Sequence, residues 1–150
     1  MLEGQIALVT GASRGIGAAI ALALAKQGAK VVGTATSESG AANITQALSA
    51  HGGIGLALDV NDAGQVESVL KSIADQFGDV SILVNNAGIT RDTLLMRMKD
   101  EDWDAVIATN LTSVYRMSQA VLRPMMKARN GRIINISSVA AGKPDSGQSS

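Results

Sequence analysis

Three glycines near the amino terminus have the spacing of a phosphate-binding loop. Gly11, Gly15 and Gly17 directly follow an apolar segment and directly precede a segment with helical periodicity, which is the context of a dinucleotide fingerprint. Gly11 permits a tight turn, Gly15 lets the backbone approach a pyrophosphate, and Gly17 allows the helix to pack closely. The amino terminus of that helix supplies amide donors and the positive end of a dipole. The loop therefore predicts a dinucleotide site.

The residues after the second apolar segment bear on which dinucleotide is bound. A site for NAD places a carboxylate here, against the ribose 2′-hydroxyl. Residues 33–37 (Gly-Thr-Ala-Thr-Ser) contain no acid, while Arg14 in the glycine loop offers a planar, charge-assisted fork to a 2′-phosphate. The sequence therefore favours NADPH. In the alternative interpretation Arg14 only faces solvent, and Glu38 serves as the ribose acid.

Polar and small residues also close the third and fourth apolar segments. Asp59, followed by Val60, stands where a carboxylate can accept a hydrogen bond from the adenine amino group, although it can equally cap the next helix. Residues 85–88 (Asn-Asn-Ala-Gly) are small enough to let the backbone approach the nicotinamide ribose. For these four residues alone, a plain turn is the alternative.

The segments that position these residues alternate between strand and helix patterns. Five short apolar runs, bounded by Gly, Asp or Asn, are typical of parallel strands buried on both faces: 6–10, 30–34, 55–58, 82–85 and 132–136. Four segments between them carry apolar residues at helical spacing: 15–27, 39–50, 63–77 and 102–128. Right-handed crossovers then predict an α/β, Rossmann-like doubly wound parallel sheet of order 3-2-1-4-5.

Composition sets broad limits on organisation and function. A chain of 150 residues fits one domain, here a single NADP-binding domain over residues 1–150. The 13 basic and 13 acidic residues balance, so no net field recruits nucleic acid or an anionic membrane. The chain has no cysteine, which excludes disulfides and zinc-thiolate sites. Its amino terminus lacks a basic, apolar leader, and we expect a cytoplasmic protein without metal or membrane span.

Taken together, these motifs resemble the short-chain dehydrogenase/reductase family. The resemblance rests on residues 10–17, residues 85–88, Asn110 and Ser138, which follow in register over nearly the whole chain. Residues 33–37 and 85–102 are similar, more narrowly, to the bacterial 3-oxoacyl-[acyl-carrier-protein] reductases of fatty acid synthesis. The resemblance implies NADPH contacts from thirteen residues: Gly11, Ala12, Ser13, Arg14, Gly15, Ile16, Gly17, Thr36, Asp59, Val60, Asn86, Ala87 and Gly88.

The same resemblance implies two catalytic residues and shows one departure. Ser138 corresponds to the serine that hydrogen-bonds the substrate carbonyl, and Asn110 to the helix residue that holds a water in the proton relay. The family also carries Tyr-x-x-x-Lys, in which the phenol protonates the substrate oxygen as hydride arrives. In register, that tyrosine would follow Ser150. Tyr115, which has Gln119 four positions on, does not match the motif and is expected to pack.

The resemblance implies NADPH-dependent reduction of 3-oxoacyl-acyl-carrier-protein to the 3-hydroxyacyl form. We expect a chain that is incomplete at its carboxyl end, lacks the last strands of the family fold and is itself inactive. The alternatives are another short-chain carbonyl reductase or a cofactor-binding fragment without catalysis. The implied partners are acyl carrier protein and further copies of the chain, a tetramer in the family. Lys127, Arg129 and Arg132 form a basic edge that either meets the acidic carrier protein or is ordinary surface charge.

Overall fold

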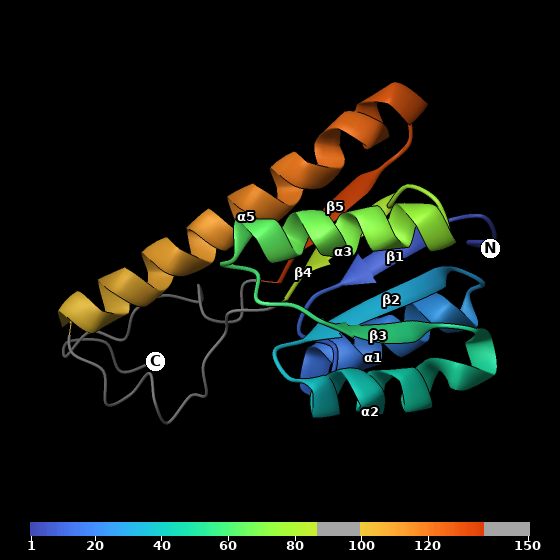
Figure 1. Ribbon diagram of the computed structural model, residues 1–150, viewed down its shortest axis with the longest axis horizontal. Coiled ribbons are helices and arrows are strands. Elements are labelled where there is room, and N and C mark those ends of the chain that lie inside the picture. The colour runs from blue at the N-terminus through green and yellow to red at the C-terminus, as the bar shows by residue number, and fades with distance from the viewer. Residues whose placement is uncertain (87–99, 137–150) are drawn as a thin grey trace, which may run out of the picture.

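A five-stranded parallel sheet organises the molecule (Figure 1). The computed structural model describes residues 1–86 and 100–136, and within residues 100–110 it describes only the helical backbone. Neighbouring strands are parallel and follow the order β3-β2-β1-β4-β5. Their bounds are β1 Ile6–Val9, β2 Lys30–Ala35, β3 Ile54–Ala57, β4 Ile82–Asn85 and β5 Arg132–Asn135. The predicted fold class and strand order are confirmed.

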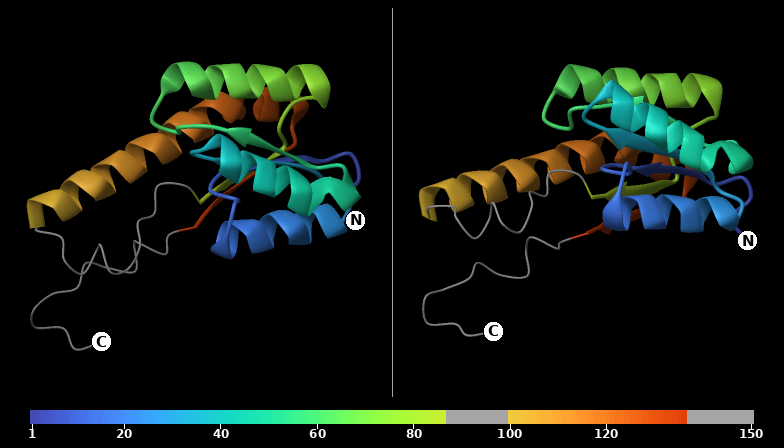
Figure 2. Two further views of the ribbon diagram at one scale, coloured as in Figure 1. Left: turned by 60° about the horizontal axis from the view of Figure 1, so that its bottom comes forward. Right: turned by 90° about the horizontal axis from the view of Figure 1, so that it is seen from below.

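Helices cover both faces of the sheet and make a three-layer arrangement (Figure 2). Side chains of α1 (Gly15–Lys26) and α2 (Glu38–Leu48) pack in one core cluster with the sheet. Those of α3 (Ala63–Gln76) and α5 (Asp100–Ala128) pack in a second cluster on the opposite face. Because all five strands are parallel, their carboxyl ends lie at one edge of the sheet, where a doubly wound fold places its ligands.

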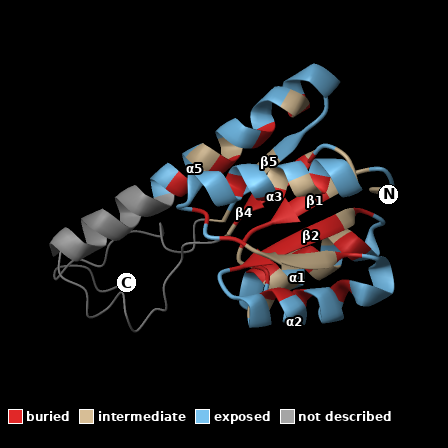
Figure 3. Ribbon diagram, in the orientation of Figure 1, coloured by how far each residue is buried: buried red, intermediate tan, exposed pale blue. Residues whose placement is uncertain are grey.

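The central strands are apolar on both faces because helices cover both faces. Leu8 and Val32 face the α3 and α5 layer, whereas Val9 and Val31 face the α1 and α2 layer, and all four are fully buried. Figure 3 shows this burial along β1 and β2 and the much greater exposure of β5. Strands β1, β2 and β4, which lead into the glycine loop, the Thr36 segment and Asn86, are thus the deeply buried strands of the sheet.

The element bounds differ from the predicted ones by one or two residues, for local reasons. Strand β2 continues to Ala35, and α2 begins at Glu38 because the Ser37 hydroxyl accepts a hydrogen bond from the Gly40 amide at 3.0 Å. Helix α2 ends at Leu48, and a 3-10 turn, Ser49–His51, leads to Gly52, which has a φ of +76°. Among residues 1–86 and 100–136, no helix combines the length and apolarity needed to cross a membrane.

Candidate cofactor site at the carboxyl edge of the sheet

The structure brings the predicted binding residues it describes to one edge of the sheet. The glycine loop follows β1, Thr36 follows β2, Asp59 follows β3 and Asn86 follows β4. Because the order is β3-β2-β1-β4, the four segments form a continuous row in which the glycine loop lies between the Thr36 and Asn86 segments. Ala87, Gly88 and Ser138 lie outside the described residues, and for Asn110 the structure gives the helical backbone of α5 alone.

Two glycines of the loop have backbone conformations that favour glycine. Gly11 and Gly15 both have a φ of +62°, in the left-handed region. Between them, Ala12 is buried, and its amide donates to the Thr34 carbonyl of β2 at 2.9 Å. The loop is therefore fixed to the sheet at its centre and turns sharply on either side before α1 begins.

Gly17 holds the first turn of α1 against the loop and against the end of β4. A Cβ atom at Gly17 would collide with the Gly11 carbonyl oxygen and with the side-chain nitrogen of Asn86. That Asn86 nitrogen itself donates to the Gly11 carbonyl at 3.0 Å. The structure thus shows Asn86 bracing the glycine loop, a contact that its predicted role toward the cofactor did not include.

Thr10 connects the same two strand ends from within the core. Its side chain is buried, and its hydroxyl accepts a hydrogen bond from the Asn86 amide at 2.9 Å and donates to the Val84 carbonyl at 3.4 Å. Thr10 belongs to the motif at residues 10–17, but no role was predicted for its side chain. The available signal was a hydroxyl at the end of an otherwise apolar strand, where a buried polar group needs partners.

The amino terminus of α1 differs from those of α2 and α3. The side chains of Ser37 and Asp62 accept hydrogen bonds from the first turns of α2 and α3. At α1 the N-cap is Arg14, whose side chain makes no such bond, and the first turn contains no acidic residue. The helical ladder begins with the Ala18 amide donating to the Arg14 carbonyl at 3.3 Å. The earlier amides of the turn and the positive end of the dipole are thus available to an anion.

The end of β2 is shaped by a close approach of α2 to the glycine loop. A Cβ atom at Gly40 would lie 2.7 Å from that of Ala35 and 3.6 Å from that of Ser13. Thr36 and Glu38 are exposed here and line a shallow groove that continues toward Asp62 and Gln65 on α3. Arg14 and Thr36 are therefore both accessible at this edge, as a contact to a 2′-phosphate requires, and so is Glu38.

The end of β3 is a compact turn in which Asp59 has a structural partner. One oxygen of its carboxylate accepts from the Asn61 amide at 2.9 Å, and its own amide donates to the Gln65 side chain at 2.9 Å. Asp62 caps α3 by accepting from the Gln65 amide at 3.1 Å. The alternative in which Asp59 caps the next helix is therefore wrong, because Asp62 performs that function.

The ends of β4 and β5 are joined by a pair of side-chain amides. Asn85, 5% exposed, donates to the side-chain oxygen of Asn135 at 2.8 Å, and the Ile136 amide donates to the Asn85 carbonyl at 2.9 Å.

The prediction that Tyr115 packs is wrong, because 65% of its surface on α5 is exposed. Gln119, one turn further along the helix, is exposed as well.

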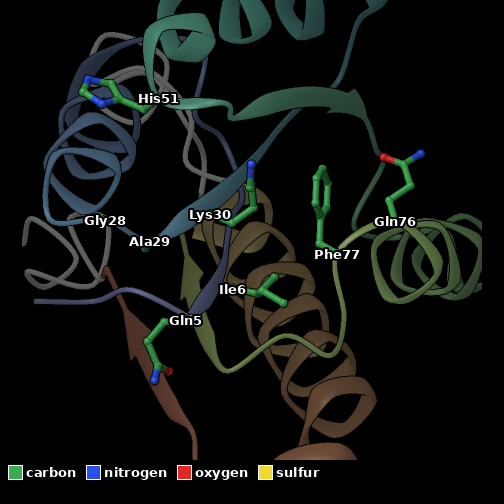
Figure 4. A pocket seen from close by; sticks show the side chains of 9 residues that line it. Gln5, Ile6, Gly28, Ala29, Lys30, His51, Gln76 and Phe77 are labelled. Atoms are coloured by element: carbon green, nitrogen blue, oxygen red, sulfur yellow. The ribbon is translucent and has the colours of Figure 1, made fainter.

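A second pocket lies at the opposite edge of the sheet, where the strands begin (Figure 4). Lys30 begins β2 there, with its ammonium 5.3 Å from the centre of the Phe77 ring and 3.3 Å from the Gly52 carbonyl oxygen. His51 lies exposed at its rim, directly before Gly52. Near this edge the pKa of Glu3 is lowered by its hydrogen bond with the amino-terminal ammonium. The charged groups described here have partners of their own.

Comparisons with known proteins agree with this architecture. Residues 5–150 match the family described as short chain dehydrogenase. The chain is 63% identical over 146 residues to the 3-oxoacyl-[acyl-carrier-protein] reductase FabG of Escherichia coli (strain K12), covering 97% of this chain and 59% of that protein. The protein of the same name from Vibrio cholerae is 61% identical over 147 residues, which cover 98% of this chain and 60% of the relative.

A more distant relative gives the same picture. The 3-oxoacyl-[acyl-carrier-protein] reductase FabG of Pseudomonas aeruginosa is 58% identical over 149 residues, covering 98% of this chain and 60% of that protein. The chain thus spans about three fifths of the length of the curated relatives it matches. That share includes the glycine loop and the ends of all five strands.

Proposed function

The chain belongs to the short-chain dehydrogenase family, and on that premise we propose that it binds NADPH along the carboxyl edge of its sheet. The observation that carries the proposal is the amino terminus of α1. It has neither a side-chain cap nor an acidic residue in its first turn, and two left-handed glycines lead into it. A pyrophosphate placed there would accept hydrogen bonds from the first amides of α1 and interact favourably with the helix dipole.

In this proposal, each of the remaining residues of the edge contacts a different part of the cofactor. Arg14 and Thr36 hold the 2′-phosphate, the Arg14 guanidinium through charge-assisted hydrogen bonds. Asp59 and Val60 receive the adenine, and Asn86 with the small residues after it borders the nicotinamide ribose. When bound, the nicotinamide supplies the hydride that reduces the substrate.

We further propose that the chain serves the reduction of 3-oxoacyl-acyl-carrier-protein in fatty acid synthesis, because 3-oxoacyl-acyl-carrier-protein is the substrate for which the relatives are named. In this assignment the Ser138 hydroxyl donates to the substrate carbonyl, and Asn110 orders a water for proton delivery. The proton itself needs an acid, and Tyr115 on α5 lacks the lysine of the Tyr-x-x-x-Lys pattern.

An exposed apolar stripe on α5 supports association between copies of the chain. Its members recur at helical spacing, and at least 45% of each is exposed: Leu111, Tyr115, Leu122 and Met126. Such a stripe on a helix is typical of a surface that another element covers. We propose that a second copy covers it, while acyl carrier protein binds as the substrate carrier.

Cofactor titration tests the proposal directly. We expect calorimetry to show tighter binding of NADPH than of NADH, because Arg14 and Thr36 replace the ribose acid. Removing the charge with Arg14→Ala should weaken NADPH by about tenfold, in line with a hydrogen bond to a charged group, and leave NADH nearly unchanged. Arg123→Ala, on the exposed side of α5, is the matched control. Tighter binding of NADH by the unmodified chain would overturn the assignment.

A further inference from the structure

Arg116 makes a contact that links two distant parts of the fold. It lies in α5, is partly buried, and donates from Nη1 to the Val60 carbonyl at 3.2 Å, across 56 positions of sequence. Among the side chains that the structure describes, the ion pairs are Met1–Glu3 and Lys71–Asp75. Among these described residues the Arg116 guanidinium binds a backbone carbonyl and no carboxylate, so this contact fixes a position in the chain.

The turn that receives this bond is held by hydrogen bonds among its own residues and with α3, and by burial of the Val60 side chain. The Asp59 carboxylate accepts from the Asn61 amide, and the Asp59 carbonyl accepts from the Asp62 amide at 3.0 Å. Gln65 of α3 accepts from the Asp59 amide. The Val60 carbonyl accepts the hydrogen bond from Arg116 of α5, while the Val60 side chain packs in the core cluster that also contains Met117. Loss of the hydrogen bond would remove this polar contact between α5 and the turn.

The position of Arg116 along α5 makes the contact effective. Met117 and Val121 bury the helix in the core immediately after Arg116. The amino-terminal part of α5 extends past the carboxyl edge of the sheet (Figure 1). Asn110 lies six residues earlier, less than two turns along the same helix. Arg116 thus lies in the packed part of α5, which includes the buried Ser113 and Met117, and close to the proposed catalytic Asn110.

We propose that Arg116 is a positioning residue, which ties α5 to the turn at residues 59–62 and holds that turn in the conformation that receives adenine. The inference rests on the proposed function for its ligand. It assigns to Arg116 no contact with the cofactor, and its effect passes through the Val60 carbonyl. The consequence is that adenine binding and the position of α5 depend on the same hydrogen bond.

The experiment compares Arg116→Met with Arg123→Met, which removes the same charge from an exposed position of the same helix. Amide hydrogen exchange without ligand is measured first. Arg116→Met should speed exchange at Asn61 and Asp62 about tenfold or more, the factor that corresponds to losing a hydrogen bond from a charged donor, and leave the amides of residues 15–17 unchanged. Arg123→Met should match the unmodified chain.

Binding of adenosine 2′,5′-bisphosphate and of NADPH is measured second. Both should weaken by a similar factor, about five- to tenfold, in Arg116→Met, because both ligands use the adenine end. Arg116→Lys retains the charge and a donor, and it is included in case Arg116→Met does not fold. In Arg116→Lys we expect smaller changes in exchange at Asn61 and Asp62 and in the binding of both ligands. Unmodified exchange at Asn61 in both Arg116 variants would overturn the inference, as would uniform acceleration across the chain. Failure of the unmodified chain to bind either ligand would instead refute the proposed function, since the exchange comparison needs no ligand.

Discussion

The two edges of the same sheet differ at the first turn of α1, although polar groups at both edges bind one another. At the amino edge they bind one another: Ser81 donates to Gln5 at 2.7 Å and accepts from the Ile6 amide at 3.1 Å, while Lys30 lies over Phe77. At the carboxyl edge the first turn of α1 has no side-chain cap. A donor left without a partner costs stability unless something else supplies an acceptor. This difference distinguishes the amino edge from the edge to which we assign the cofactor.

The largest effect is expected where the loop, α1 and β4 meet. Gly17→Ala should lower the free energy of unfolding by about 2 to 3 kcal/mol and abolish NADPH binding, because the added Cβ would collide with the Gly11 carbonyl. Chemical denaturation and calorimetry measure the two effects. Gly64→Ala in α3, where a Cβ would lie 3.4 Å from its nearest neighbour, should instead stabilise by about 0.5 to 1 kcal/mol.

If Gly17→Ala bound NADPH as tightly as the unmodified chain, the carboxyl edge would tolerate displacement of the loop. The proposed distinction between the two edges would then fail at Gly17, where the structure leaves no room for a Cβ atom.

A smaller effect is expected at the buried hydroxyl that joins β1 to β4. Thr10→Val keeps the volume but leaves the Asn86 amide without this acceptor, which should cost about 1 to 3 kcal/mol of stability and weaken NADPH binding severalfold. Thr10→Ser keeps the hydroxyl and should bind NADPH nearly as the unmodified chain does. Equal behaviour of the two variants would show that the hydrogen bond does not brace the edge.

The smallest effect is expected at the amino edge. Lys30→Met removes the ammonium from the Phe77 ring and from the Gly52 carbonyl, which should lower stability by about 0.5 to 1 kcal/mol and leave the affinity for NADPH unchanged. Lys30→Arg should stay close to the unmodified chain, because an arginine can stack on the same ring. Weaker NADPH binding in Lys30→Met would mean that the two edges are coupled.

The sequence predicted the strand order and the glycine loop because both depend on local signals. Apolar runs bounded by turn residues identified the five strands, and the context of Gly11, Gly15 and Gly17 identified the first helix. The contacts that give the edge its geometry are long-range: Thr10 with Asn86, and Arg116 with Val60. No spacing in the sequence reports such pairs. The exposure of Tyr115 was missed for a similar reason, since helical periodicity does not say which side chains of a helix another element covers.

The central claim is that the carboxyl edge receives the cofactor, and amide hydrogen exchange with and without NADPH measures it most directly. We expect NADPH to slow exchange at residues 15–17 and around Thr36 and Val60, with no change at residues 51–53 or at Phe77. Protection confined to residues 51–53 and Phe77, or no protection at residues 15–17 under saturating NADPH, would contradict it.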